Sequence, residues 1–426
     1  MKTDISTSLF SRLLPLAITA ALGAVGTAAS AAPLDLMFDT RAPADGVTGA
    51  SVTRHLEGSP SIRSIQYVGM RPELLARGED QLRLTLPDGS TVIASLSESA
   101  VLDEEATTWS GTIGDASARA QGNDNALFVV TNERVFGQIH LKGQVFEVMT
   151  VEEGGHYLMV ERDFSALPQT DDTPRQAFDL GKETLLDEKD GSASRAITTV
   201  RVLQIATREA RDQLGGSNSA RDRMRFFLAQ ANNVYANTRI DVRLQNAGLR
   251  TPSGRVNNND GPSLVNQLAN TSDGRAYDWL AGGSNSGNGR NGRNADLVGL
   301  MTASGLRFSA GGLCGIADAI AANSGTAFFL TNQTCTNFTF VHEIGHLFGA
   351  RHDNDPNVTP FRYGHGFVSA AGNFRTVMAV NGNPQPRIGA FSADNLQLGG
   401  IIIGNSSFRD NRRVHQVRRG TMASFR

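Results

Sequence analysis

The spacing of hydrophobic residues divides the chain into two regions. Polar and apolar residues alternate over 81–86, and apolar blocks follow at 126–130 and 145–149. Alternation with a period of two is typical of strands that bury one face, and the turn-forming residues 87–90 (Pro-Asp-Gly-Ser) follow the first of these segments. We therefore predict a small antiparallel, β-rich domain over residues 32–165.

Residues 196–426 show a different pattern. An apolar strand is expected at 198–205, and residues 219–236 place Met224, Phe227, Leu228, Ala231 and Val234 at helical spacing. Further strands are expected at 240–244 and 296–301. Strands separated by helical segments predict a mixed α/β domain. Between the two regions, residues 166–195 are polar and Asp-rich, which indicates an exposed linker of the kind that proteases cut.

The N-terminus has the features of an export signal. Lys2 and Arg12 supply positive charge, 13–24 is a short apolar run, and 29–31 (Ala-Ser-Ala) is a small-x-small cleavage site. The run is too short for an ordinary membrane span, although an uncleaved anchor is the alternative. We predict a signal peptide over 1–31 and a secreted mature protein that does not cross a membrane.

Charge is unevenly distributed. The net charge is only -2, but residues 32–195 hold 14 basic and 27 acidic residues, whereas 196–426 hold 24 Arg, no Lys and 14 acidic residues. Regions of opposite sign attract, and a basic surface favours anionic partners; drift in surface composition is the simpler reading. The sequence contains no basic run with interleaved aromatic residues, the pattern that would indicate nucleic-acid binding.

The chain has two cysteines, Cys314 and Cys335. In an exported protein an even pair predicts one disulfide, which adds roughly 3 kcal/mol for a loop of this length in the chain-entropy model. Two unpaired buried thiols are the alternative.

The strongest chemical signal is the segment 342–352, His-Glu-Ile-Gly-His-Leu-Phe-Gly-Ala-Arg-His. On a helix, His342 and His346 lie on one face and can hold a zinc ion, and Glu343 can act as the general base on a water that the metal activates. Thr336 or Asn337 is expected to cap the helix. Gly349 allows a sharp turn that brings back His352 as the third ligand. An amphipathic helix with incidental histidines is the alternative.

This segment resembles the signature of the metzincin zinc proteases. The resemblance implies that Asp353 steadies the loop after the third ligand, and that residues 375–379 (Arg-Thr-Val-Met-Ala) form a Met-turn with Met378 beneath the metal. Val380 stands where astacins have a Tyr ligand. Three protein ligands are therefore expected.

Four further segments resemble the bacterial peptidyl-Asp metallopeptidases: 312–317, 340–346, 363–366 and 374–378, together with the chain ending from 411 to 426. The resemblance implies cleavage on the amino side of Asp, and bidentate contact of an Arg with the carboxylate fits the Arg-rich region. Arg362 and Arg387 are candidates, although either is more often a surface residue. His365 is either a pocket contact or a loop histidine with a satisfied hydrogen bond.

In metzincins an edge strand before the catalytic helix binds extended substrate, and either 316–321 or 328–330 is expected to supply it. The acidic first domain is expected to be a propeptide and thus a partner of the catalytic domain. No cysteine precedes Cys314, so a propeptide thiol does not silence the metal. Because the linker is Asp-rich, self-cleavage within it, for example at Lys189-Asp190, is predicted.

The predicted function is a secreted, zinc-dependent endopeptidase of protein or peptide substrates that prefers acidic residues. Two alternatives stay open: a metzincin of different specificity, and a secreted binding protein that uses an inactive metzincin fold. Retention of Glu343 argues against the second, because binding alone does not need a base.

Overall fold

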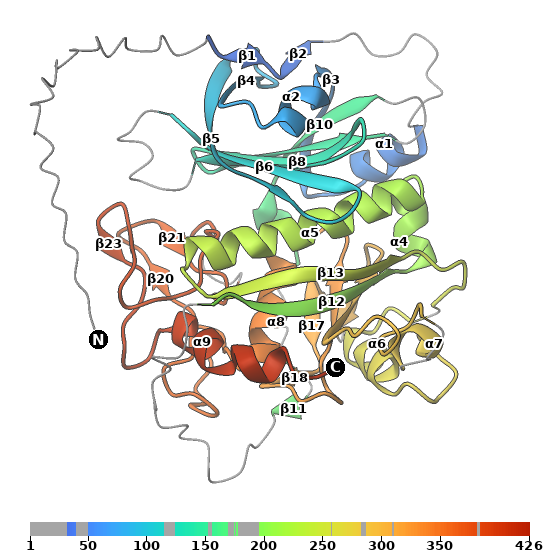
Figure 1. Cartoon of the computed structure of the whole chain (residues 1–426). Coiled ribbons are helices and arrows are strands. Elements are labelled where there is room, and N and C mark those ends of the chain that lie inside the picture. The colour runs from blue at the N-terminus through green and yellow to red at the C-terminus, as the bar shows by residue number, and fades with distance from the viewer. Residues whose placement is uncertain are drawn as a thin grey trace, which may run out of the picture. The chain divides into compact units, whose positions relative to one another are not determined.

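The computed structural model describes residues 32–39, 50–114, 124–151, 156–168, 174, 176–177, 196–256, 258–282, 287–308, 311–380 and 384–426 (Figure 1). The predicted signal peptide, residues 1–31, lies outside the described residues, as does most of the predicted linker, including Lys189-Asp190.

A ten-stranded sheet forms the N-terminal domain, in the order β1-β4-β5-β6-β7-β8-β9-β10-β3-β2. All pairings are antiparallel except that of β1 with β4. The strands predicted from sequence are β4, β7 and β9. The elements of this domain are β1 (Leu34–Asp35), β2 (Met37–Asp39), α1 (Ala50–Glu57), β3 (Ile62–Met70), α2 (Pro72–Arg77), β4 (Gln81–Thr85), β5 (Thr91–Val101), β6 (Ala106–Ile113), β7 (Asn125–Thr131), β8 (Arg134–Leu141), β9 (Gln144–Thr150), β10 (Tyr157–Arg162) and the 3-10 turn η1 (Phe164–Ala166).

The C-terminal domain, residues 196–426, is built on a five-stranded sheet in the order β13-β12-β14-β19-β17. The first four strands are parallel and β17 is antiparallel to β19, so the predicted mixed α/β architecture is confirmed. Its larger elements are β12 (Thr198–Ala206), α4 (Arg208–Gln213), α5 (Ser217–Asn237), β13 (Val242–Arg250), α6 (Gly261–Ala269), α7 (Asp278–Ala281), β14 (Leu297–Thr302), β17 (Gly315–Ala317), β19 (Phe328–Asn332), α8 (Thr339–Phe348) and α9 (Asn411–Met422). Short strand pairs are β15 (Arg307–Phe308) with β16 (Gly311–Gly312), β20 (Val368–Ser369) with β21 (Phe374–Arg375), and β22 (Gln397–Leu398) with β23 (Ile401–Ile402).

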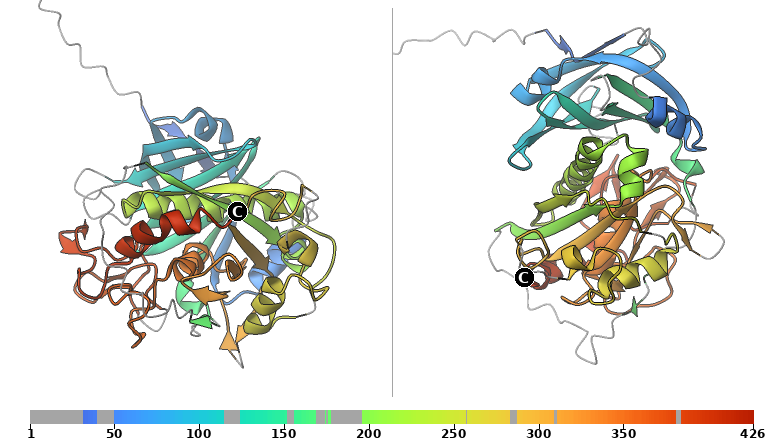
Figure 2. Two further views of the ribbon diagram at one scale, coloured as in Figure 1. Left: turned by 60° about the horizontal axis from the view of Figure 1, so that its bottom comes forward. Right: turned by 90° about the vertical axis from the view of Figure 1, so that its right-hand side faces the viewer.

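Both faces of this sheet are covered by helices (Figure 2). Val200 and Val202 belong to the apolar cluster that contains residues of α5 and α8. Leu203 and Ile205 belong to a second cluster with residues of α6 and α7. Burial on both faces explains why the central strands read as continuous apolar runs.

Helix α5 of the C-terminal domain packs against both domains. It begins two residues before the predicted range and ends one residue after it. Phe227 stacks on Phe340 of α8 at 5.7 Å between ring centroids, whereas Phe226 meets Phe136 of β8 at 4.8 Å. One hydrophobic cluster therefore includes residues of both domains.

The described part of the linker differs from the predicted exposed segment. Leu167 and Pro174 are buried, and a Cβ added to Gly312 would lie 2.9 Å from Cγ of Pro168. Strand β11 (Gln176–Ala177) pairs in parallel with β18 (Ala319–Ile320). The prediction of exposure is wrong at these points because the chain lies against residues that flank β17.

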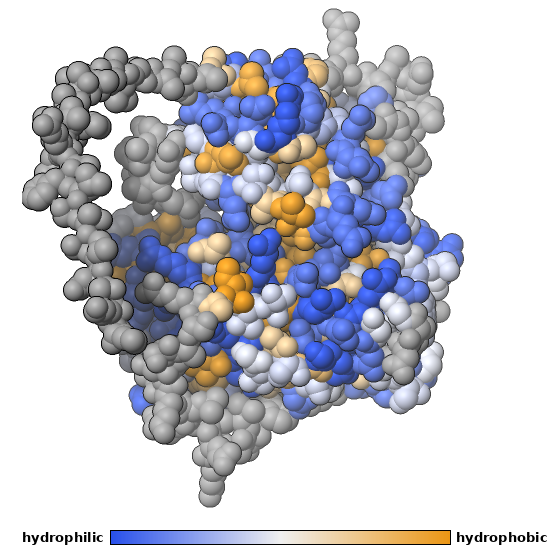
Figure 3. Space-filling model, in the orientation of Figure 1, coloured by the Kyte–Doolittle hydropathy of each residue, from blue (hydrophilic) through white to orange (hydrophobic). Residues whose placement is uncertain are grey.

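Among the described residues, no helix is both long and apolar enough to cross a membrane. Hydrophilic side chains dominate the face seen in Figure 3, with hydrophobic side chains in separate groups.

Candidate metal centre

The metal motif lies on α8, which starts differently from the prediction. Phe338 occupies the N-cap position with a φ of 60°, and no side chain caps the helix. The Thr336 hydroxyl instead bonds Glu147 of β9, and the Asn337 carbonyl accepts from Arg387. The predicted cap at Thr336 or Asn337 is therefore wrong, because the N-cap position falls on Phe338, after both residues, and the Thr336 hydroxyl bonds Glu147 instead.

The end of α8 follows the prediction. Gly349 has a φ of 113°, in the left-handed region that glycine tolerates, and its N–H donates to the carbonyls of Gly345 and His346. The chain turns there and returns His352 to the helix. The three predicted ligands, His342, His346 and His352, are buried and form the one potential metal cluster found among the described residues.

Their geometry fits a zinc ion. The Nε2 atom of His352 lies 3.2 Å from Nε2 of His342 and 3.0 Å from Nε2 of His346. A tetrahedral zinc site with Zn–N bonds of ~2.0–2.1 Å has N–N edges of about 3.3–3.4 Å. Three side chains from a helix and a following loop thus converge at nearly the spacing that such a site requires.

Hydrogen bonds at the opposite ring atoms set the tautomers. Nδ1 of His342 donates to the carbonyl of Val377 over 2.8 Å, and Nδ1 of His346 donates to that of Ala350 over 2.9 Å. In the neutral rings this leaves Nε2 of both histidines as an acceptor, next to Nε2 of His352. A cation satisfies this arrangement, and the carbonyl partners orient its ligands.

Glu343 lies on α8 beside the first ligand and is fully buried. Its carboxylate occupies the space left by the missing side chain of Gly315, the first residue of β17. A Cβ there would lie 2.5 Å from Oε1 of Glu343 and 2.8 Å from the carbonyl oxygen of Leu330. The glycine therefore makes room for the predicted base.

The Met-turn expected from the resemblance lies beneath this helix. Met378 is buried, and a Cβ on Gly345 would lie 2.5 Å from its sulfur. Gly345 lies between His342 and His346 in sequence, so the Met378 side chain packs against the helix that carries these two candidate ligands. Asp353 accepts a hydrogen bond from the N–H of Val380 over 3.1 Å, which ties the third-ligand loop to the Met-turn.

His365 is held in its loop by a hydrogen bond and a ring contact. Its Nε2 lies 2.8 Å from the carbonyl of Asn357, and its ring stacks on Phe408 at 4.1 Å. Burial lowers its pKa, against the opposing effect of the Asn357 hydrogen bond. Of the two readings, the geometry matches a loop histidine with a satisfied hydrogen bond.

The two candidate arginines differ. Arg362 is exposed. Arg387 donates from Nη1 to the carbonyl of Asn337 and from Nη2 to that of Ala379, both over 3.0 Å. It is therefore not a simple surface residue: it joins the start of α8 to the Met-turn.

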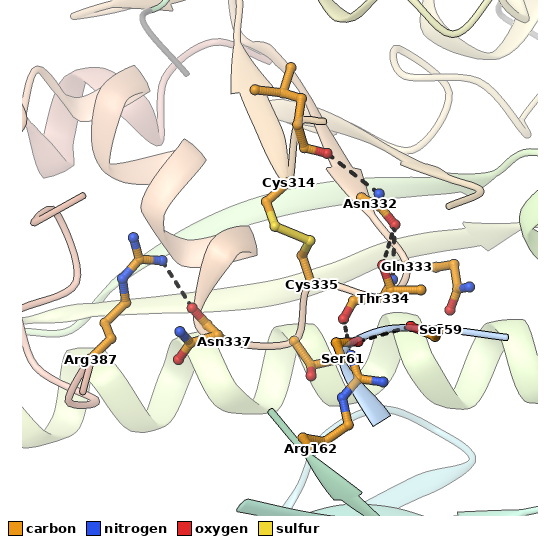
Figure 4. Close-up of a disulfide and its surroundings, with 12 residues drawn as sticks. Ser59, Ser61, Arg162, Cys314, Asn332, Gln333, Thr334, Cys335, Asn337 and Arg387 are labelled. Atoms are coloured by element: carbon orange, nitrogen blue, oxygen red, sulfur yellow. Dashed lines mark hydrogen bonds between the residues drawn. A yellow bond between two sulfur atoms is a disulfide. The ribbon is translucent and has the colours of Figure 1, made fainter. Parts of the chain in front are cut away.

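The predicted disulfide is present between Cys314 and Cys335 (Figure 4). Cys314 immediately precedes β17, and Cys335 lies in the segment that leads to α8. The bond links these two segments across 21 positions of sequence. Strand β17 lies at one edge of the five-stranded sheet, opposite β13, whereas β19 lies between β14 and β17. Of the two predicted substrate strands, 316–321 therefore begins at an edge of the sheet and 328–330 does not.

Sequence reasoning missed the residues that shape the site without donating a ligand. Gly315, Gly345 and the carbonyl of Val377 belong to this group. The first two stand inside recognisable segments, but only the three-dimensional contacts reveal what each glycine accommodates.

Sequence comparisons with known proteins identify the family of this chain. Residues 196–392 match the family model described as metallo-peptidase family M12. The peptidyl-Asp metalloendopeptidase of Xanthomonas campestris pv. campestris is 30% identical over 91% of this chain and 92% of its own length, and that of Stenotrophomonas maltophilia is 30% identical over 94% and 96%. Among solved structures, metalloproteinase-II from Bacteroides fragilis has a TM-score of 0.43 and 11% identity over 70% of this chain and 92% of its own. On the sequence matches, the chain belongs to the metzincin-like metallopeptidases of family M12, together with the bacterial peptidyl-Asp metalloendopeptidases.

Proposed function

We propose that this metalloendopeptidase uses zinc, that Glu343 is its general base, and that it cleaves on the amino side of aspartate. The observation that carries the zinc assignment is the convergence of three imidazole Nε2 atoms, because neutral imidazole is a preferred zinc ligand. A bound zinc ion supplies Lewis-acid activation of water and of the scissile carbonyl.

The residues of this chain perform the remaining steps. His342, His346 and His352 hold the metal, and the carboxylate of Glu343 takes a proton from the attacking water and passes it to the leaving amine. Burial of Glu343 beside β17 supports this role, because a fixed carboxylate loses little freedom in the reaction. An inactive binding protein would need neither the base nor the space beside Gly315.

The aspartate preference rests on the names of the relatives and on the Arg-rich catalytic region. The decisive experiment is a peptide-library cleavage profile of the purified enzyme with and without a chelator. We expect cleavage before Asp to exceed cleavage before Asn by at least about tenfold, since a paired carboxylate adds more than 1.4 kcal/mol. Chelation should abolish cleavage, and added zinc should restore it. Equal cleavage before Asn and Asp would favour a metzincin of different specificity.

We further propose that the chain is exported through residues 1–31 and that residues 32–165 act as a propeptide. The path of the linker supports latency. Pro168 lies beside Gly312 and β11 pairs with β18, so the linker adjoins both ends of the edge strand that an extended substrate would join.

Self-processing of the linker is a separate prediction. Active chain is expected to be cut between residues 166 and 195, and Glu343→Gln chain is expected to stay intact when purified alone. N-terminal sequencing of both proteins measures this. Cutting of the purified variant at the same bond would exclude self-cleavage.

A further inference from the structure

The segment before α8 is held largely by side chains. Residues Gln333–Asn337, which we name the strap, connect β19 to the N-cap of α8 and include Cys335. Gln230 donates to the carbonyl of Thr336 over 2.9 Å, and Arg223 donates to that of Gln333 over 2.7 Å. The strap has no regular secondary structure, so these contacts, the disulfide and the backbone bond from Gln333 N–H to the carbonyl of Thr302 together determine its path.

The N-terminal domain supplies a second set of contacts to the strap. Glu147 of β9 accepts from the Thr336 hydroxyl. Arg162 of β10 donates to the carbonyl of Thr334, as Figure 4 shows beside the disulfide. The ring of His140 lies 5.8 Å from that of Phe338, the N-cap residue.

Glu147 is the centre of this contact. Its side chain is fully buried and lies 3.8 Å from guanidinium nitrogens of Arg162 and Arg223, one from each domain. Gln138 adds a hydrogen bond over 3.0 Å. Burial alone would raise the pKa of Glu147, but the two arginines and the hydrogen bonds from Thr336 and Gln138 outweigh it and lower the pKa.

A buried carboxylate is costly unless charges and hydrogen bonds compensate it. Here the compensation requires the strap to be in place, since Thr336 supplies one hydrogen bond and the strap carbonyls anchor both arginines. The cluster therefore forms as a unit with the strap. The strap in turn leads directly into the helix that carries His342 and His346.

We propose that the N-terminal domain is a folding template for the catalytic helix and that Glu147 is its main positioning residue. By fixing Thr336, Glu147 sets the path of the strap, places Cys335 for pairing with Cys314, and orients the start of α8. This role extends the propeptide function proposed above, but its test involves no proteolysis, so the two proposals can fail separately.

The test uses the chain carrying Glu343→Gln, and only preparations whose intact mass is that of the unprocessed protein are compared. Glu147→Gln removes the charge at nearly constant shape, Thr336→Val removes the hydroxyl, and Thr336→Ser retains it. Glu98→Gln is the matched control, because Glu98 is exposed in the same domain. Amide hydrogen exchange over residues 333–341, zinc affinity by competition with a chromogenic chelator, and the rate of Cys314–Cys335 formation during oxidative refolding are measured.

We expect Glu147→Gln and Thr336→Val to raise exchange over 333–341 by about tenfold or more, to weaken zinc binding several-fold and to slow disulfide formation. Thr336→Ser and Glu98→Gln should resemble the parent chain. If Glu147→Gln raises exchange throughout the protein, that variant is globally destabilised. Thr336→Val then decides whether the contact between Thr336 and Glu147 fixes the strap. Unchanged exchange and zinc affinity in Thr336→Val, or equal loss in Thr336→Ser and Thr336→Val, would overturn the proposal.

Discussion

Glu343→Gln is expected to lower kcat by about 10²–10⁴-fold, the usual contribution of a general base, while zinc content and KM stay nearly constant. Glutamine keeps the shape of the buried side chain beside Gly315 but cannot accept the proton. Loss of kcat without a rise in KM is the pattern expected when an interaction needed only in the transition state disappears.

The catalytic domain provides its own control. Glu209 and Glu343 are the only glutamates between residues 196 and 426, and Glu209 pairs with Arg255 at the surface over 3.3 Å. Glu209→Gln should leave kcat and zinc content unchanged. Steady-state kinetics on one peptide, with zinc measured on the same samples, compares the two variants. Activity of Glu343→Gln within a factor of three of the parent would exclude Glu343 as the base.

The loss expected from a ligand has a different signature. His352→Ala removes one of three Nε2 donors, so activity should fall together with bound zinc, and excess zinc should recover part of it. This contrast separates the proposed general base from the proposed metal ligands.

The metal motif was predictable because its chemistry is local. His342 and His346 lie one helical turn apart, Gly349 has the left-handed conformation that the turn needs, and His352 follows at once. The strands β12 and β14 were equally predictable from sequence, because burial on both faces produces continuous apolar runs. These features depend on neighbouring residues, which a single sequence displays directly.

The start of the catalytic helix was not predictable in this way. Thr336 has the residue type of an N-cap, yet it lies two positions before the observed N-cap, Phe338, and its hydroxyl bonds a carboxylate 189 positions earlier in the chain. Helix propensity and capping preferences cannot anticipate such a distant partner. The same holds for Arg387, which reads as a surface residue in sequence but bonds the Asn337 and Ala379 carbonyls.

Gly315→Ala is expected to lower kcat by about 10²-fold, the cost that a displacement of about 1 Å has for a catalytic group. The added methyl group would lie 2.5 Å from Oε1 of Glu343 and 2.8 Å from the carbonyl oxygen of Leu330. The carbonyl belongs to the neighbouring strand β19, which is paired on both sides. The flexible carboxylate is therefore the group that moves furthest, while β17 shifts slightly to relieve the contact with the carbonyl, and the three histidines keep their positions.

Kinetics, zinc content and thermal unfolding of the same preparations test this expectation. Zinc should stay bound, and the free energy of unfolding should fall by only about 1–3 kcal/mol, the range for overpacking one buried methyl group. Gly420→Ala is the matched control, because nothing lies within 4 Å of the Cβ it adds in α9, and it should leave kcat unchanged. If Gly315→Ala kept full activity, strand β17 would have yielded instead of the carboxylate, and the glycine would not be what positions Glu343.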